Sequence, residues 1–329
     1  VALNEGAKGL LYGTYGASAI VLVGLWWRLR ARLGVRGPGG APLRTLLGFG
    51  LPTVPADASL FALNLVDRYY LFHARSASAA GLYSLAVKLA GVVVFTTRAF
   101  QYAWPPLAYS VRDDDEAAQL YAVVATWYVA FTGVIVAGLM LLGRWVVRLL
   151  AAPSFFAAHT ALPWVALGWA LYGLVLILVA VAGRARVTTR NFPAAALGLL
   201  ANGALLVLLV PQFGVAGAGL ALVGAYLVML TALHLFTRRL FPVAFEWGRL
   251  AVAVSLIGGF AVAGELLLPT SGLVGFIERV AVLAVIPVVL LAVGFLRAGE
   301  RAGLLELIAR VRAWRGGRVD AGPAPEGGP

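Results

Sequence analysis

Long apolar segments recur along the whole chain, and this feature limits the possible folds more than any other. Each segment has at least 18 residues, so each can cross the roughly 30 Å hydrocarbon core at about 1.5 Å of rise per helical residue. The sequence therefore predicts an all-α, polytopic transmembrane helix bundle of about nine spans. These are Leu10–Trp27, Leu46–Leu71, Ala80–Trp104, Leu120–Leu142, Ala161–Ala182, Pro193–Val210, Val215–Phe236, Leu250–Pro269 and Phe276–Leu296.

The composition supports lipid as the solvent for most of the surface. Apolar residues make up 61% of the 329 residues and charged residues 12%, whereas soluble domains carry about 25% charged residues. The net charge of +12 comes from short basic segments between apolar runs, which indicates membrane loops and no nucleic-acid partner. The chain has no cysteine, which excludes disulfides and thiolate metal sites, and its three histidines are scattered. We expect neither a metal nor a cofactor.

The distribution of basic residues predicts the orientation. Eighteen arginines fall in one set of connections and at the carboxyl end, against four basic residues, Lys8, Arg75, Arg144 and Arg148, in the alternate set. The first set, which includes Arg28, Arg112, Arg184, Arg238 and Arg249, is predicted to be cytoplasmic. Trp104 and Trp247 lie at predicted inner boundaries, where amphipathic rings anchor helices.

Nine spans with a cytoplasmic carboxyl end place the amino end outside, and we therefore expect the sequence to begin partway through a larger protein. Three parts follow: residues 1–45 as a span and a basic, Gly/Pro-rich linker, 46–297 as a helix bundle, and 298–329 as a cytoplasmic amphipathic helix at Gly303–Trp314 with a disordered tail.

Several smaller features predict local structure. Asp113–Glu116 is expected to cap the following helix at its positive end. Gly214, Gly217 and Gly219 predict a tight turn with close helix packing, and Asn202 a packing hydrogen bond. Pro52, Pro55, Pro105 and Pro106 are expected to interrupt or end helices, and Glu265, Glu278 and Arg279 to lie at the interface.

Two segments resemble a known family. The first comprises Leu47–Pro55 (LGFGLPTVP), Asn64–Leu71 (NLVDRYYL), Ala80–Leu89 (AGLYSLAVKL) and Phe100–Pro106 (FQYAWPP). It resembles the start of the second half of bacterial polysaccharide (O-antigen-type) flippases of the multidrug/oligosaccharidyl-lipid/polysaccharide exporter superfamily. The second, Asn202 to Gly219, resembles that superfamily's helix–turn–helix hairpin.

This resemblance implies two bundles of helices around a central cavity. The nine spans would then be the last helix of the first bundle and the whole second bundle, and Arg28–Arg44 would join the two halves. It also implies a membrane-embedded partner, an undecaprenyl-diphosphate-linked oligosaccharide, in a bacterial inner membrane.

Ionised residues inside spans are the main candidates for function, because hydrocarbon tolerates them only beside water or in pairs. Asp57, Asn64 and Arg68 form one stripe with Phe61 on the second span. Asp57 is predicted near the bilayer centre. It is either a group that couples transport to a cation or proton, or a hydrogen-bonding partner of the next helix.

Asp67 and Arg68 are consecutive, so they point about 100° apart and cannot both face one cavity. Arg68 is a candidate for substrate binding. Asp67 is either a second ion-coupling group or a structural residue, which snorkels toward the interface or belongs to an interhelical ion pair.

Lys88 and Arg98 lie ten residues apart on the third predicted span, which would place both on one broad face with Gln101 nearby. Two cations along one conduit suit the phosphates of a lipid-linked glycan, which Arg and Lys bind through charge-assisted hydrogen bonds. The alternative is a pair of ion pairs, Lys88 with Asp67 and Arg98 with Asp57.

Three functions follow. The favoured one is flipping of a lipid-linked oligosaccharide by alternating access, with Arg68, Lys88, Arg98, Asn64 and Gln101 in contact with the substrate. The second is a multidrug cation antiporter, which Asp57 supports. The third is a membrane glycan polymerase or acyltransferase, for which the predicted external loop Gly143–Thr160 offers only Arg144, Arg148, Ser154 and His159. We expect a transporter rather than an enzyme.

Overall fold

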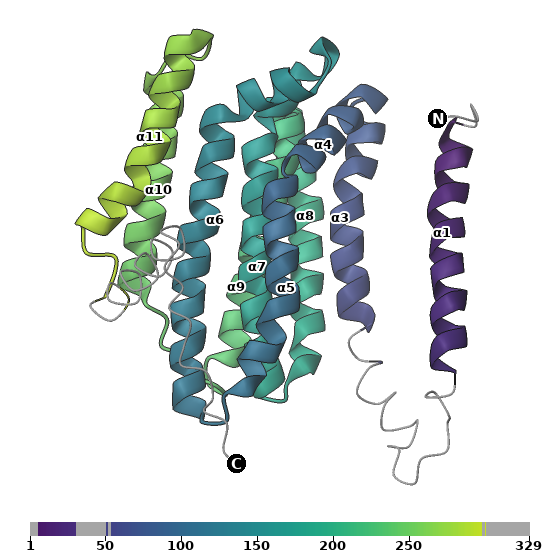
Figure 1. Cartoon of the computed structure of the whole chain (residues 1–329), viewed down its shortest axis with the longest axis vertical. Coiled ribbons are helices and arrows are strands. Elements are labelled where there is room, and N and C mark those ends of the chain that lie inside the picture. The colour runs from purple at the N-terminus through teal and green to yellow at the C-terminus, as the bar shows by residue number, and fades with distance from the viewer. Residues whose placement is uncertain (1–5, 31–50, 52–53, 298–299, 301–329) are drawn as a thin grey trace, which may run out of the picture. The chain divides into compact units, whose positions relative to one another are not determined.

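The structure is a computed structural model that describes residues 6–30, 51, 54–297 and 300 (Figure 1). The chain divides into two compact units, residues 1–51 and 52–329. The first unit contains α1 (Gly6–Leu29), a helix of 24 residues. The predicted linker beyond Arg30 and the predicted helix at Gly303–Trp314 lie outside the described residues.

The second unit is a bundle of long helices that run side by side (Figure 1). Their order is α3 (Val54–Ala74), α4 (Ala77–Leu89), α5 (Gly91–Ser110), α6 (Asp114–Leu150), η2 (Pro153–Thr160), α7 (Leu162–Arg184), η3 (Thr188–Arg190), α8 (Asn191–Phe213), α9 (Val215–Thr237), α10 (Trp247–Leu267) and α11 (Gly272–Ala292). The described part of the chain contains no strand.

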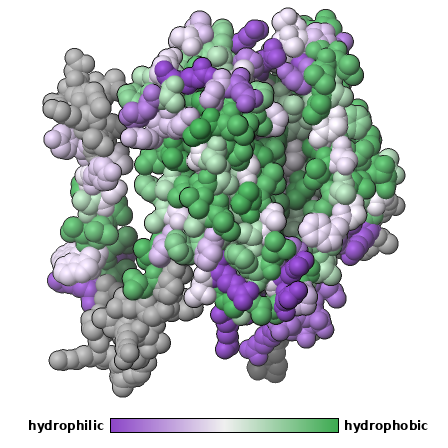
Figure 2. Space-filling model, turned by 180° about the vertical axis from the view of Figure 1, so that it is seen from behind, coloured by the Kyte–Doolittle hydropathy of each residue, from purple (hydrophilic) through white to green (hydrophobic). Residues whose placement is uncertain are grey.

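Among the described residues, six helices, α6 to α11, are long and apolar enough to cross a membrane, and the bent pair α4–α5 makes a seventh if it counts as one span. Figure 2 shows hydrophobic side chains over the middle of the bundle and hydrophilic ones at both ends. The chain is therefore a multi-pass α-helical membrane protein. The predicted number was nine; α1 and α3 are helical but are not among these six or seven, and in α3 the reason is its polar residues Asp57, Asn64, Asp67 and Arg68.

The third predicted span, Ala80–Trp104, is broken. α4 and α5 meet at Ala90 and are bent by 55° relative to each other. Pro105 and Pro106 do not interrupt a helix as predicted, because α5 continues through both to Ser110. The bend falls next to Gly91, whose missing side chain leaves open space at the corner.

Helix α6 is longer than predicted at both ends. It begins at Asp114, and the side chain of Asp113 accepts hydrogen bonds from the backbone N–H groups of Asp115 (3.0 Å) and Glu116 (2.9 Å). This confirms the predicted acidic cap. At the other end the helix continues to Leu150, so the first half of the predicted loop Gly143–Thr160 is helical and η2 forms much of the remainder.

The α8–α9 hairpin is confirmed, and its glycines have the predicted roles. Gly214 joins the two helices with φ of +59°, a conformation that favours glycine. A Cβ atom on Gly217 would lie 2.7 Å from the carbonyl carbon of Leu209, so the two backbones approach too closely for any side chain there. The small residues of α9, including Ala218, Ala221 and Ala225, are fully buried against neighbouring helices.

The α10–α11 hairpin is held to α6 by a buried ion network. Arg279 is 0% exposed and donates to the Glu265 carboxylate, to the carbonyl of Leu141 on α6 (3.0 Å) and to that of Pro269 (3.1 Å). Arg144 of α6 binds the other oxygen of Glu265 at 2.8 Å. Glu265 lies near the end of α10, as predicted, and is partly exposed. Arg279 is not exposed at an interface but buried within the protein, because its hydrogen bonds allow the guanidinium to be buried.

A second polar network lies at the opposite end of the same hairpin. Glu300 accepts hydrogen bonds from the indole of Trp127 on α6 (2.9 Å), from Arg249 of α10 (2.8 Å) and from the backbone N–H of Arg297 (2.8 Å). Burial raises the pKa of Glu300, but these hydrogen bonds and the charge of Arg249 together outweigh it, so the pKa lies below its ordinary value. The hairpin is thus fixed to α6 at both ends.

We predict that Gly217→Ala destabilises the protein by about 1–3 kcal/mol, because the added methyl group overlaps the backbone of α8. Gly203→Ala is the matched control: no atom lies within 4 Å of a Cβ there, and alanine stabilises a helix interior by up to about 1 kcal/mol. Unfolding in detergent micelles measures both, and equal effects would contradict the assigned close approach.

Candidate transport site

A cavity of about 500 Å³ lies between α3, α5 and α7, near the helix ends that carry Arg112, Arg184, Arg186 and Arg190. We call it the tyrosine-lined cavity, and the helix ends beside it the arginine-rich end. The lining combines aromatic and polar side chains in one place. The residues that define it are Asp57, Gln101, Tyr102, Trp104, Tyr109, Tyr172 and Asn191, with apolar residues from α3, α5, α7 and Met229 of α9.

Asp57 lies in the first turn of α3, because the helix begins at Val54. The prediction that Asp57 lies near the bilayer centre counted helical residues from Leu46. Residues 46–50 lie outside the described part of the chain, so this depth stays a prediction. At a helix N-terminus the unpaired backbone N–H groups and the helix dipole stabilise a carboxylate. Asp57 is exposed at the wall of the tyrosine-lined cavity.

Gln101 and Arg98 are brought to this region by α5. Gln101 lines the cavity, and Arg98 lies one helical turn away, where it is exposed and its guanidinium carbon stands 5.9 Å from the centre of the Trp169 ring. Trp169 in turn packs edge-on against Tyr172. Tyr172 also lines the cavity and is close enough to both Arg98 and Asp57 for their charges to act on its hydroxyl.

Lys88 is separated from this group by the bend. It is exposed in the last turn of α4, whereas Arg98 belongs to α5. The predicted shared face assumed one straight helix, and the 55° bend removes that premise. The alternative ion pairs, Lys88 with Asp67 and Arg98 with Asp57, also do not form within the part of the chain that the structure describes.

Asp67 lies in a separate buried polar cluster. Its carboxylate is 1% exposed and accepts a hydrogen bond of 2.6 Å from the hydroxyl of Tyr83 on α4. Its other oxygen, Oδ1, has no hydrogen-bond partner among the described residues. The predicted interhelical ion pair is thus replaced by a neutral donor, and half of the carboxylate remains unsatisfied.

Two further polar groups lie close to this carboxylate. Asn202 of α8 is fully buried beside it, and neither atom of the Asn202 amide reaches hydrogen-bonding geometry within the described structure. The hydroxyl of Tyr226 on α9 is buried and equally lacks a partner there. Asn202 thus lies beside Asp67, but the packing hydrogen bond predicted for it does not reach hydrogen-bonding geometry within the described residues. We call Asp67, Tyr83, Asn202 and Tyr226 the buried polar cluster.

Asn64 and Arg68 border this cluster rather than the tyrosine-lined cavity. Asn64 is half-buried near Tyr226, and its amide donates to the carbonyl of Leu60 at 2.8 Å. Arg68 is half-buried close enough to Asp67 for their charges to interact. The predicted site residues thus fall into two groups. Asp57, Gln101 and Arg98 lie at or beside the tyrosine-lined cavity, and Asp67, Asn64 and Arg68 lie in or beside the buried polar cluster.

Sequence reasoning missed the partners that complete both places. Tyr83, Tyr172, Asn191 and Tyr226 come from four different helices, and nothing in their local pattern distinguishes them from packing residues. The one available signal was Tyr83, which stands in the quoted AGLYSLAVKL segment.

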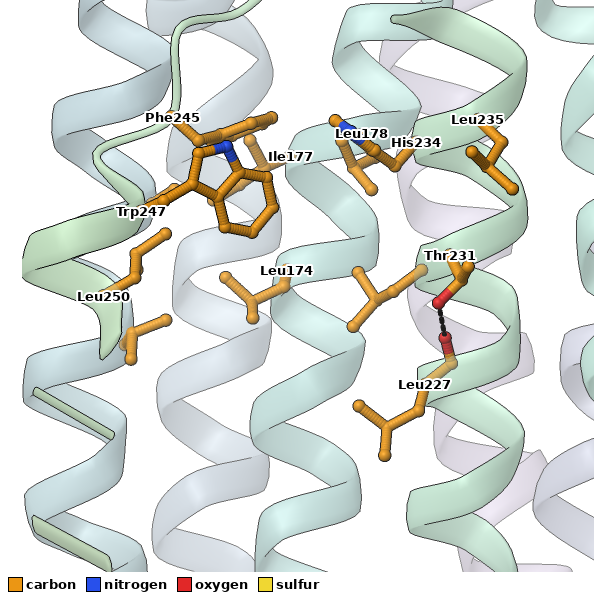
Figure 3. Close-up of a pocket in the computed structure, with 13 residues that line it drawn as sticks. Leu174, Ile177, Leu178, Leu227, Thr231, His234, Leu235, Phe245, Trp247 and Leu250 are labelled. Atoms are coloured by element: carbon orange, nitrogen blue, oxygen red, sulfur yellow. Dashed lines mark hydrogen bonds between the residues drawn. The ribbon is translucent and has the colours of Figure 1, made fainter. Parts of the chain in front are cut away.

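An apolar pocket of about 400 Å³ lies between α6, α7, α9 and the start of α10 (Figure 3). Thr231 and His234 are its polar lining residues, and the Thr231 hydroxyl donates to the carbonyl of Leu227 in its own helix. The rings of Phe245 and Trp247 flank His234, with centroids 5.9 and 5.7 Å away. This lining suits hydrocarbon and not a phosphate.

The fold has a counterpart among solved structures. The structure described as "Lipid II flippase MurJ, inward closed conformation" matches this chain with a TM-score of 0.56 and 14% sequence identity. This chain therefore shares the helical fold of that structure. The match covers 80% of the chain and 58% of that flippase, so the chain spans less than two thirds of the protein it matches. Neither a protein-family model nor a curated protein matches the sequence.

The shared fold confirms the predicted fold class, an all-α transmembrane helix bundle. At 14% identity the match carries the fold alone, and it does not assign a substrate. The predicted roles of Asp57, Asn64, Asp67, Arg68, Lys88, Arg98 and Gln101 stay predictions.

We predict that Tyr83→Phe destabilises the protein by about 1.5–3 kcal/mol, because it removes the hydrogen bond to a buried carboxylate. The same change in an Asp67→Asn background is expected to cost less, which a double-mutant cycle detects as coupling between the two side chains. Tyr69→Phe, on the same helix as Asp67 and 65% exposed, is the control. Additive effects of the two substitutions would contradict the assigned bond.

Proposed function

We propose that the protein takes part in flipping a lipid-linked oligosaccharide across the bacterial inner membrane, for surface polysaccharide biosynthesis. The observation that carries this proposal is the exposed Arg98 of α5, beside a cavity, in a chain with a lipid-flippase-like fold. The O-antigen class of substrate comes from the motif resemblance alone.

Arg98 lies twelve residues before the end of α5 at Ser110, which places it about 18 Å from that end of the helix. An ionised side chain at such depth is costly in hydrocarbon and is stabilised beside water or an anion. A diphosphate supplies two neighbouring anions, and the planar guanidinium binds phosphate through paired N–H donors. Arg98 is therefore the residue we assign to the phosphates, whereas Lys88 and Arg68 are placed for contacts elsewhere.

In the proposed mechanism the substrate is moved and not chemically changed. Two helix bundles would open alternately to the two sides of the membrane, with the lipid tail left among acyl chains. The arginine-rich end and the carboxyl end would face the cytoplasm. Two of the four residues weighed for an enzyme make local contacts: Arg144 binds Glu265, and the His159 ring makes a hydrogen bond with the carbonyl of Phe156.

We further propose that the buried polar cluster couples transport to a cation or a proton, with Asp67 as the ionisable group. The carboxylate Oδ1 and both amide atoms of Asn202 lack partners in the described structure. Unsatisfied buried groups of this kind are costly unless an ion, a proton or water completes them. Asp57 is less suited to this role, because it is exposed in the first turn of α3.

A multidrug cation antiporter is the second candidate. One observation favours it: the tyrosine-lined cavity contains the Asp57 carboxylate and four aromatic side chains, and none of the described residues that line it is basic. Carboxylates and aromatic faces both attract organic cations. Uptake of a cationic dye, measured with Asp57→Asn as the control, separates this function from flipping.

We predict that Arg98→Ala lowers the initial flipping rate about 10- to 100-fold, the equivalent of losing one charge-assisted hydrogen bond. The flipping rate of Arg98→Lys is expected to lie between those of the wild type and Arg98→Ala, because lysine keeps the positive charge but cannot form the paired hydrogen bonds of a guanidinium. The assay follows a lipid-linked oligosaccharide in proteoliposomes. Arg148→Ala is the control, since Arg148 is exposed near the carboxyl end of α6, beside Phe156. Full transport by Arg98→Ala would remove Arg98 from the phosphate site.

Asp67→Asn is expected to abolish the dependence of flipping on an imposed sodium or proton gradient, because asparagine cannot bind and release a charge at this place. Asp115→Asn, on the exposed first turn of α6, is the control and should leave the gradient dependence intact. If Asp67→Asn still responds to both gradients as the wild type does, the coupling group lies elsewhere.

A further inference from the structure

We propose that the tyrosine-lined cavity binds a sugar ring, the one attached directly to the phosphates that Arg98 holds. This inference rests on the proposed function and deepens it, because it names the part of the substrate that the described helices recognise. It assigns Gln101, Asn191 and Asp57 to the sugar hydroxyls.

The cavity offers the hydrogen-bonding groups that a polyol needs. An amide both donates and accepts, a carboxylate accepts through two oxygens, and a tyrosine hydroxyl does either. Gln101, Asn191 and Asp57 come from three different helices and meet at this one cavity. Neighbouring hydroxyls of a sugar present donors and acceptors side by side, which matches this set.

Two polar atoms at the cavity still lack partners. The side-chain oxygen of Asn191 and the indole nitrogen of Trp104 are buried, and neither makes a hydrogen bond within the described residues. Both residues line the cavity. Buried unsatisfied donors and acceptors cost free energy, and one acceptor with one donor is what a hydroxyl-rich ligand can satisfy.

The aromatic side chains that line the cavity offer an apolar surface for the C–H faces of a sugar ring. Tyr102 and Tyr109 of α5 are 77% and 51% exposed, and Tyr172 faces them from α7. Rigid amphipathic rings supply contact area at a low cost in conformational entropy. A volume of about 500 Å³ lies within the usual range for small-ligand pockets.

An organic cation suits the cavity less well than a neutral polyol. Asp57 is already stabilised by the positive end of α3, which weakens its attraction for a second cation. Arg98 lies close enough to act electrostatically on Tyr172, and its charge repels cations from the same place. A neutral sugar is not repelled by Arg98 and does not depend on attraction to Asp57.

The position of Arg98 sets which sugar is bound. Residues three and four apart on a helix are neighbours, about 5–6 Å between Cβ atoms. Arg98 is therefore adjacent to Gln101 and Tyr102, both of which line the cavity. A diphosphate bound at Arg98 places its first sugar there, and more distant sugars of the glycan extend past it.

The test is ligand binding to the purified 329-residue chain in detergent micelles, followed by saturation-transfer NMR. The probes are glucose 1-phosphate, inorganic phosphate and tetraphenylphosphonium. We expect glucose 1-phosphate to bind more tightly than phosphate. Gln101→Ala and Asn191→Ala should each weaken the sugar phosphate about 3- to 10-fold and leave phosphate unchanged. Arg98→Ala should weaken both anions.

Gln119→Ala is the matched control, because Gln119 is exposed on α6 and does not line the cavity. Melting temperatures show whether each variant is folded, and Gln101→Asn provides a milder change if Gln101→Ala is not. Equal binding of glucose 1-phosphate and phosphate by the wild type would overturn the proposal. So would tetraphenylphosphonium binding that Asp57→Asn abolishes.

The outcomes separate this inference from the proposed function. If the sugar phosphate binds as expected while no lipid-linked oligosaccharide is flipped, the flippase proposal fails and the sugar site stands. If the wild type flips the lipid-linked oligosaccharide, and Gln101→Ala and Asn191→Ala both flip every glycan lipid at the wild-type rate, the proposed sugar site is wrong and the flippase proposal stands.

Discussion

Hydrocarbon does not solvate charge, and in this protein each ionised side chain within the bundle has to find its own compensation. Arg279 shows the most complete solution, with zero exposure and hydrogen bonds to Glu265 and to three backbone carbonyls. Because removing a charge from water costs several kcal/mol even after relaxation, such a residue is stable only when the surrounding helices are already in place. The α10–α11 hairpin and α6 are therefore held together by ion pairs and hydrogen bonds as well as by apolar packing.

The same constraint separates structural charges from functional ones. Arg279 is satisfied by protein groups alone, and we assign it to the architecture. Asp67 is satisfied by Tyr83 on one oxygen only, and Arg98 has a ring contact with Trp169 as its described interaction. Incomplete satisfaction at a buried or deep position marks where a ligand can contribute, which is why the coupling group and the phosphate site are assigned to these two residues.

The tyrosine-lined cavity and the buried polar cluster use α3 in different ways. The first turn of α3 contributes Asp57 to the cavity, and the face with Asp67 contributes to the cluster about ten residues later. A movement of α3 against α8 and α9 would alter both places together. One helix thus connects the proposed substrate site with the proposed coupling site, and that connection is what an ion-driven transporter requires.

How much could be predicted depended on whether the signal was local. Apolar runs determined by themselves that the chain forms membrane-crossing helices, and the acidic cap at Asp113 and the glycine hairpin at Gly214 were also predictable, because each acts within a few residues. The break at Ala90, the burial of Arg279 and the hydrogen bond from Tyr83 to Asp67 were decided only by the tertiary structure. Periodicity assigns a residue to a face of its helix, but the partner that satisfies a buried charge comes from another helix, and helix packing alone determines which one.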